Sequence, residues 1–190
     1  MPFNPTPTPP PIRRNIVVSD LAVLSEEEAS NADVDGCLAG NQHYNDLRGM
    51  TFADLAATLV REDALVDVFE AVGDPAALEE RFAQERGTAF EPVDDLWGLD
   101  VGVAGAVIAL SALGATPVSS CNGAIYGPAH QSHYSYVAFY LADADLSVLL
   151  RLAEAEALGL VGNDGLAHLY GSVSALRMFA RRALDESSTS

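Results

Sequence analysis

Side chains that can do chemistry gather in one stretch of the second half of the chain. Ser119, Ser120, Cys121 and Asn122 stand directly before Gly123, and more polar side chains follow them: Tyr126, His130, His133 and Tyr134. A thiol at a strand end, beside a turn with exposed backbone N–H groups and within reach of an imidazole, can act as a nucleophile. The pattern therefore predicts catalytic roles for Cys121, His133 and His130. Ligand binding is predicted for the two serines, Asn122 and the two tyrosines.

Two other interpretations of the same residues stay open. Asn122-Gly123 between two short runs is typical of a type I′ hairpin, which would set Cys121 opposite Ala124 as a buried, inert thiol. Alternatively, the backbone N–H groups of this turn would hold an anion. A nucleophilic site would also need an orienting carboxylate, for which Asp100 and Asp164 are the candidates.

A metal site is a further alternative for this stretch. His130 and His133 have a spacing that two ligands of one metal ion use, and Cys121 and His168 are further candidate ligands. On its own, His168 fits a histidine within a strand. The residues leave the metal and any cofactor unidentified.

Charge excludes one class of partner and favours another. The chain has 27 Asp and Glu against ten basic residues, all of them Arg, which gives a net charge of −17. Residues 1–100 hold 20 of these acids and six Arg, a difference of −14. Duplex nucleic acid requires a basic face, so we expect no such partner. An acidic surface suits a basic protein partner instead. A composition without Lys is typical of GC-rich bacterial genomes, or less often of salt-adapted proteomes.

The sequence predicts neither a membrane span nor a secretory signal. Residues 101–142 carry no Asp, Glu, Lys or Arg. The apolar run within them, 101–113, is about half the length of a membrane span and ends at Gly114. Six of the first eleven residues are proline, so the N-terminus has no apolar signal core. We therefore expect a soluble cytoplasmic protein with free thiols at Cys37 and Cys121. Its oligomeric state is not indicated.

Proline content, charge and helix-capping residues divide the chain into three segments. Residues 1–12 form a proline-rich tail predicted to be disordered, and residues 13–98 form an acidic, mainly helical segment. Within that segment, a short strand is expected near Asn15 and helices are expected after Ser25 and Thr51. A further helix is expected over 74–87, and a long loop over 31–50. Residues 99–186 form an α+β unit, and we expect the whole chain to be one compact unit.

The α+β unit follows from the order of its elements. Asp100 is placed to cap a helix over 101–113, and strands are expected over 115–121 and 134–141. A helix over 145–157, two strands over 158–161 and 166–170, and a helix from Ser172 complete it. This order predicts a two-layer sheet with helices on one face, plus a mainly helical N-terminal segment.

One part of the chain resembles a known family. The run from Asp100 through Ala106-Val-Ile-Ala-Leu-Ser-Ala-Leu-Gly to Ser119-Ser-Cys-Asn-Gly, then Tyr136-Val-Ala-Phe, is similar to the Ser-Ser-Cys-x-Gly region of the wybutosine-synthesis tRNA methyltransferases. The resemblance implies a shared α+β topology over about residues 100–160 and a site near Ser120 and Cys121. Where that family has Arg after the glycine, this chain has Ala124. With a net charge unsuited to tRNA as well, methyl transfer is not carried over.

Two hypotheses about function result. The first is an acidic regulatory or neutralising protein that binds a basic protein partner, based on the charge of residues 1–100 and the proline-rich tail. The second is an enzyme or small-ligand protein that uses the Cys121, His130 and His133 region. Convergence of Ser119–Asn122 and both histidines on one open pocket would favour the second hypothesis, whereas a buried Cys121 with scattered histidines would count against it.

Overall fold

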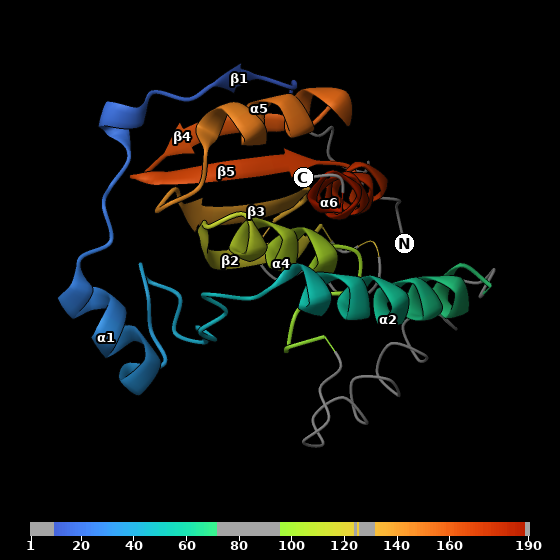
Figure 1. Ribbon diagram of the computed structural model, residues 1–190, viewed down its shortest axis with the longest axis horizontal. Coiled ribbons are helices and arrows are strands. Elements are labelled where there is room, and N and C mark those ends of the chain that lie inside the picture. The colour runs from blue at the N-terminus through green and yellow to red at the C-terminus, as the bar shows by residue number, and fades with distance from the viewer. Residues whose placement is uncertain (1–9, 72–95, 124, 126–131, 189–190) are drawn as a thin grey trace, which may run out of the picture.

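The computed structural model describes residues 10–71, 96–123, 125 and 132–188 (Figure 1). At its centre is a five-stranded sheet in the order β1-β4-β5-β3-β2. The strands are β1 (Arg14–Asn15), β2 (Thr116–Asn122), β3 (Ser135–Tyr140), β4 (Gly159–Asn163) and β5 (Leu166–Gly171). β1 runs parallel to β4 and the other neighbours are antiparallel, so β2 forms one edge of the sheet. The α+β class predicted from the sequence is confirmed.

Helices cover one face of this sheet. They are α4 (Ala104–Ala112), α5 (Leu146–Ala155) and α6 (Val173–Ser187), and α2 (Phe52–Glu70) packs against α4 and α6 (Figure 1). Alternate residues of a strand point to opposite faces, and Val137 and Phe139 of β3 point into this helical layer, where both are fully buried. Among the described helices, none combines the length and the apolar character that crossing a bilayer requires.

α1 (Glu26–Asp35) stands apart from the helical layer (Figure 1). Its Ala32 packs with Val118 of β2 and Tyr140 of β3 in a small separate cluster. Because Tyr140 alternates with Phe139, this cluster lies on the face of the sheet opposite the helical layer. α1 runs five residues into the region predicted as a loop, to Asp35, and its C-cap is Gly36, whose φ is 61°.

Local capping explains where the helices begin. The Ser25 and Thr51 side chains each accept a hydrogen bond from a backbone N–H three residues on, and both motifs are complete capping boxes. Asp145 and Ser172 cap α5 and α6. These predictions are confirmed. The helix predicted over 74–87 lies outside the described residues, as does most of the predicted tail.

The structure corrects the prediction of which residue caps α4. Asp100 was predicted to cap a helix over 101–113, but α4 begins at Ala104 and its N-cap residue, Val103, makes no side-chain cap. The Asp100 carboxylate instead accepts a hydrogen bond from the backbone N–H of Asn122 at 3.3 Å. This bond ties the carboxylate to the edge strand.

The structure also corrects the prediction of a tight hairpin at Asn122-Gly123. Cys121 pairs with Tyr136, and Asn122 pairs with Ser135, so residues 123–134 connect the two strands. The tight hairpin of this sheet lies between β4 and β5. There Asp164 and Gly165 have φ values of 49° and 81°, as a type I′ turn requires at both central positions.

β1 connects the N-terminal segment to the sheet. The Leu160 N–H donates to the Arg13 carbonyl oxygen at 2.8 Å. The Tyr170 hydroxyl donates to the Pro11 carbonyl oxygen at 2.8 Å and accepts from the Arg13 N–H at 3.0 Å. The segment predicted as mainly helical thus also contributes a strand, and Pro11, within the predicted tail, contacts Tyr170.

Candidate functional site

The predicted site residues do not all lie together. Ser119, Ser120, Cys121 and Asn122 all belong to β2. Cys121 is 1% exposed, and its Sγ lies 3.8 Å from the Ser132 carbonyl oxygen. By contrast, the His133 side chain is exposed. His130 and Tyr126 lie outside the described residues, so their predicted roles stay predictions.

Tyr134 belongs to an aromatic group on the face of the sheet away from the helical layer. Its ring centroid lies 6.0 Å from that of Tyr136 and 6.0 Å from that of Tyr170. Tyr136 in turn stacks on His168, with ring centroids 5.8 Å apart. Burial raises the pKa of Tyr136, although a hydrogen bond with the Ser119 side chain acts in the opposite direction.

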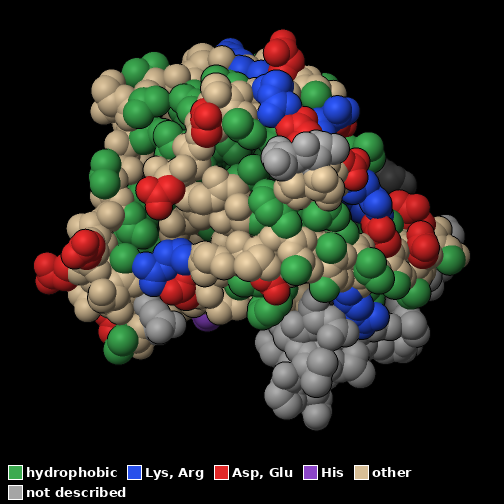
Figure 2. Space-filling view, in the orientation of Figure 1, with side chains coloured by type: hydrophobic (Ala, Val, Ile, Leu, Met, Phe, Trp, Pro, Cys, Tyr) green, Lys and Arg blue, Asp and Glu red, His purple; other side chains and the backbone are tan. Residues whose placement is uncertain are grey.

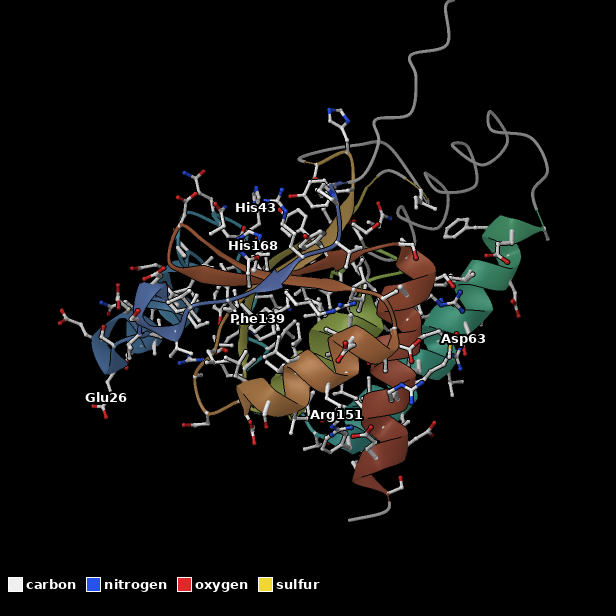
Figure 3. All side chains as sticks on the ribbon, turned by 90° about the horizontal axis from the view of Figure 1, so that it is seen from above. Glu26, His43, Asp63, Phe139, Arg151 and His168 are labelled. Atoms are coloured by element: carbon white, nitrogen blue, oxygen red, sulfur yellow. The ribbon has the colours of Figure 1, made fainter. Side chains whose placement is uncertain are left out.

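His168 lies in β5, as predicted, and its surroundings favour the neutral ring. Burial lowers the pKa of His168, although the negative charge of Asp164 acts to raise it. Figure 3 shows His168 and His43 on the side of the sheet away from α5 and α6. Within the part of the chain that the structure describes, no group of three His, Cys, Asp or Glu residues is arranged to hold a metal ion. The metal alternative thus has no support from these residues.

A cleft of about 730 Å³ lies along the outer edge of β2. Two of its walls come from residues 39–47, in the loop after α1, and from residues 97–100, before α4. Six described polar side chains line it: Asn41, His43, Asn45, Asp100, Ser119 and Ser120. Sequence reasoning singled out the two serines and named Asp100 as a candidate carboxylate, but it placed none of them beside His43.

Hydrogen bonds between distant segments hold the walls of the cleft. The Asn41 side-chain amide donates to the Val118 carbonyl oxygen at 2.7 Å, which ties the first wall to β2. The Asn45 amide donates to the Trp97 carbonyl oxygen at 3.0 Å, and so joins the two walls. In addition, the Trp97 indole N–H donates to Thr58 of α2 at 3.3 Å.

Trp97 adopts a backbone conformation that is rare for a large side chain. Its φ is 59°, in the left-handed region, and Gly98 follows with φ 74°. Such a conformation costs free energy and is maintained only where surrounding contacts determine it. The bonds from Asn45 and to Thr58 are such contacts. Sequence reasoning did not assign Trp97 or Asn45 to a site, because neither lies in a periodic segment.

Glu62 is the buried charge that sequence reasoning missed. Its carboxylate accepts the N–H groups of Gly102 at 2.9 Å and Gly105 at 3.2 Å, at the N-terminal end of α4. Burial raises its pKa, although those two donors and the positive charge of Arg177 favour the carboxylate. The signal was available in the sequence, because Glu62 is three residues from the buried Leu59 and three from the buried Leu65. A carboxylate on the apolar face of a helix needs a partner in the core.

Acidic side chains of the described residues are interspersed with arginines. The face in Figure 2 shows red and blue side chains as neighbours at several places. Ion pairs among the described residues include Asp46–Arg48, Asp63 with Arg177 and Arg181, Glu156–Arg182, and Glu186–Arg151. The cleft differs, since its described lining contains Asp100 and His43 but no arginine.

Comparison with protein-family models, with curated proteins and with solved structures finds no match to this chain. The resemblance of residues 100–160 to the wybutosine-synthesis methyltransferases stays a prediction. The site is therefore interpreted from its own geometry.

Proposed function

We propose that this protein binds a small polar molecule in the cleft at the outer edge of β2. The observation that carries the proposal is the convergence of His43, Asn45, Asp100, Ser119 and Ser120 on one cleft of about 730 Å³. Clefts that hold small molecules have volumes of about 300–1,000 Å³, with a few polar groups on a partly apolar lining. Here Leu47, Leu99 and Val107 supply apolar lining.

The position of Trp97 supports the proposal. Its side chain is 40% exposed and lines the cleft, and its backbone has a strained φ. An exposed indole offers a flat apolar surface with one polar edge, which is suited to stacking on a ligand. Strained residues held in place by their surroundings are common at ligand-binding sites.

This proposal shares the small-ligand class of the second hypothesis but not its site at Cys121, His130 and His133. Ser119 and Ser120 keep the predicted ligand-binding role, whereas Cys121 and His133 are not among the described residues that line the cleft. Nucleophilic catalysis by Cys121 stays a prediction, and its side chain is almost fully buried. A basic protein partner also stays a prediction, as do the cytoplasmic location and the bacterial origin.

A cleft-filling variant tests the proposal. The full chain would be screened by ligand-observed NMR against small amides, sugars, nucleosides and carboxylic acids. We expect at least one class to bind, and Ser120→Tyr to abolish that binding because the added ring occupies the cleft. Ser174→Tyr, at an exposed position of α6, is the matched control. If no class binds, or if Ser120→Tyr binds as well as the control, the proposal is wrong.

A further inference from the structure

The backbone N–H and C=O of Ser120 point out of the sheet toward the cleft. Their direction follows from the alternation of hydrogen-bonding directions along each strand. In antiparallel strands, each residue directs both its N–H and its C=O to one side, and successive residues alternate. Leu160 donates to Arg13 and so faces β1, which makes its partner Leu169 face β3. The backbone groups of Leu169 therefore pair with those of Val137 in β3, so the N–H and C=O of Val137 point toward β5. They point away from β2, where Ser120 is the residue opposite Val137. The Ser120 N–H and C=O point outward from the sheet edge.

The residues two positions on either side of Ser120 support this orientation. An outward backbone group of each already has a hydrogen-bond partner. Two residues further on, the Asn122 N–H donates outward to Asp100. Two residues before, beyond the irregularity between Pro117 and Ser119, the Val118 carbonyl accepts from Asn41. Within the described ranges, no partner is found for the Ser120 N–H or C=O. One residue of the edge is thus open, between two that are capped.

This geometry limits what pairs with the edge. A β-strand added to β2 would need several consecutive outward groups, and Asn41 and Asp100 occupy the ones on either side of Ser120. A single aminoacyl residue needs only one N–H and one C=O, which matches what Ser120 presents. The edge therefore favours a short molecule over an extended chain.

Charge narrows the ligand further. Asp100 is the only carboxylate among the described residues that line the cleft, and that lining contains no arginine. A carboxylate close to the bound molecule favours a positive charge and disfavours a negative one. A neutral ligand remains compatible with the lining.

We propose that the cleft binds a single aminoacyl residue flanked by amide bonds, with a neutral or positively charged side chain, paired with the backbone of Ser120. This inference rests on the proposed function, because it names the ligand class of the same cleft. The residue's own N–H donates to the Ser120 carbonyl, and its own carbonyl accepts from the Ser120 N–H. Ser119, His43 and Trp97 then surround its side chain and its flanking amides.

The test uses the full chain labelled with ¹⁵N and three small probes. These are Nα-acetyl-lysine N-methylamide, its Nα-methylated counterpart, and Nα-acetyl-glutamate N-methylamide. We expect the first to shift the Ser120 amide resonance. Methylation removes one hydrogen bond and should weaken binding by up to about tenfold. The glutamate probe should also bind more weakly than the lysine probe.

Protein variants test the same two contacts. Ser120→Pro removes the outward N–H without removing a ladder bond, and Pro117 shows that β2 already accommodates a proline. This variant should bind the lysine probe about as weakly as the wild type binds the methylated probe. If the variant does not fold, the methylated probe alone tests the hydrogen bond. Asp100→Asn should reduce the preference for lysine over glutamate, whereas Asp67→Asn, at an exposed position of α2, should not.

The outcomes separate the two proposals. If the methylated probe binds as well as the first, or if the Ser120 resonance does not move, the aminoacyl inference is wrong. If sugars, nucleosides or carboxylic acids bind the cleft while the aminoacyl probes do not, the aminoacyl inference fails and the proposed function stands. If no compound binds the cleft, both fail.

Discussion

The Glu62 carboxylate of α2 accepts the backbone N–H of Gly102 at 2.9 Å, across 40 residues of sequence. It also accepts the N–H of Gly105, within the first turn of α4. The N-terminus of a helix carries a partial positive charge, so this carboxylate serves as a cap supplied by another helix. A Cβ at Gly105 would lie 2.9 Å from the Glu62 Oε2, which explains why a glycine stands there.

The charge of Glu62 should make stability depend on pH in a distinctive direction. Burial raises its pKa above the ordinary value of 4.5, so its contribution is fully present below the unfolded pKa and is lost as pH rises through the folded pKa. Glu62→Gln removes this titration. We expect the free energy of unfolding of the variant, relative to the wild type, to rise as pH increases above the ordinary pKa of 4.5. Urea unfolding at several pH values measures it.

The matched control for this experiment is Glu70→Gln, at an exposed position of the same helix. Its free energy of unfolding, relative to the wild type, should change less over the same pH range. A Glu62→Gln difference that stays constant with pH would contradict a raised pKa for Glu62.

Asp63 should have the opposite pH dependence. Burial acts to raise its pKa, but hydrogen bonds from Arg177 at 2.6 Å and Arg181 at 2.5 Å outweigh burial, so the pKa is lowered. Its contribution is present above the unfolded pKa and is lost as pH falls through the folded pKa. We expect Asp63→Asn to cost about 1 kcal/mol at neutral pH, since the site is partly exposed. The cost should disappear in acid.

Chemical unfolding of the Asp63→Asn and Asp67→Asn variants measures this cost, with Asp67 as an exposed position on the same helix. An equal effect at both positions would show that the two arginines contribute nothing specific through Asp63.

Gly159 in β4 should not tolerate a side chain. A Cβ at this position would lie 2.2 Å from Cζ of Tyr170, the residue paired with it. Gly159→Ala should therefore cost about 1–3 kcal/mol, as overpacking does. Gly162→Ala in the same strand is the control, because its Cβ would meet Leu21 at an ordinary 3.4 Å. Thermal unfolding in the Tyr170→Ala background should show a smaller cost for Gly159→Ala.

The two thiols should differ in reactivity. Cys37 is exposed, whereas Cys121 is buried. With Cys37 changed to Ser, we expect Cys121 to resist iodoacetamide until the chain is unfolded by denaturant, because alkylation requires access to Sγ. Rapid labelling of native protein at neutral pH would instead favour the predicted nucleophile, and its loss in His133→Ala would identify the base.

Local signals in the sequence predicted most of the elements. The capping boxes at Ser25 and Thr51 involve residues only three apart, so they can be recognised without knowledge of the fold. Asn122-Gly123 is a local signal that failed, since the partner of Cys121 is Tyr136 and not Ala124. The strand pairing of the whole sheet determined that register.

The site was less predictable because its parts meet through tertiary contacts. His43 and Trp97 lie in segments with no periodic pattern, and their positions depend on bonds that Asn41 and Asn45 make to distant backbone. The cap at α4 was predicted incorrectly for the same reason. Asp100 has the right spacing, but Glu62 reaches the same helix end from another element.

Trp97 is the only tryptophan of the chain, and it lines both the cleft and a smaller hollow that Thr58 and Ala64 of α2 help to line. Its ultraviolet emission therefore comes from a single position at the cleft wall. A molecule that enters the cleft changes the solvent contact of this one indole. The protein thus carries an intrinsic fluorescent reporter of occupancy, which needs neither a label nor an engineered residue.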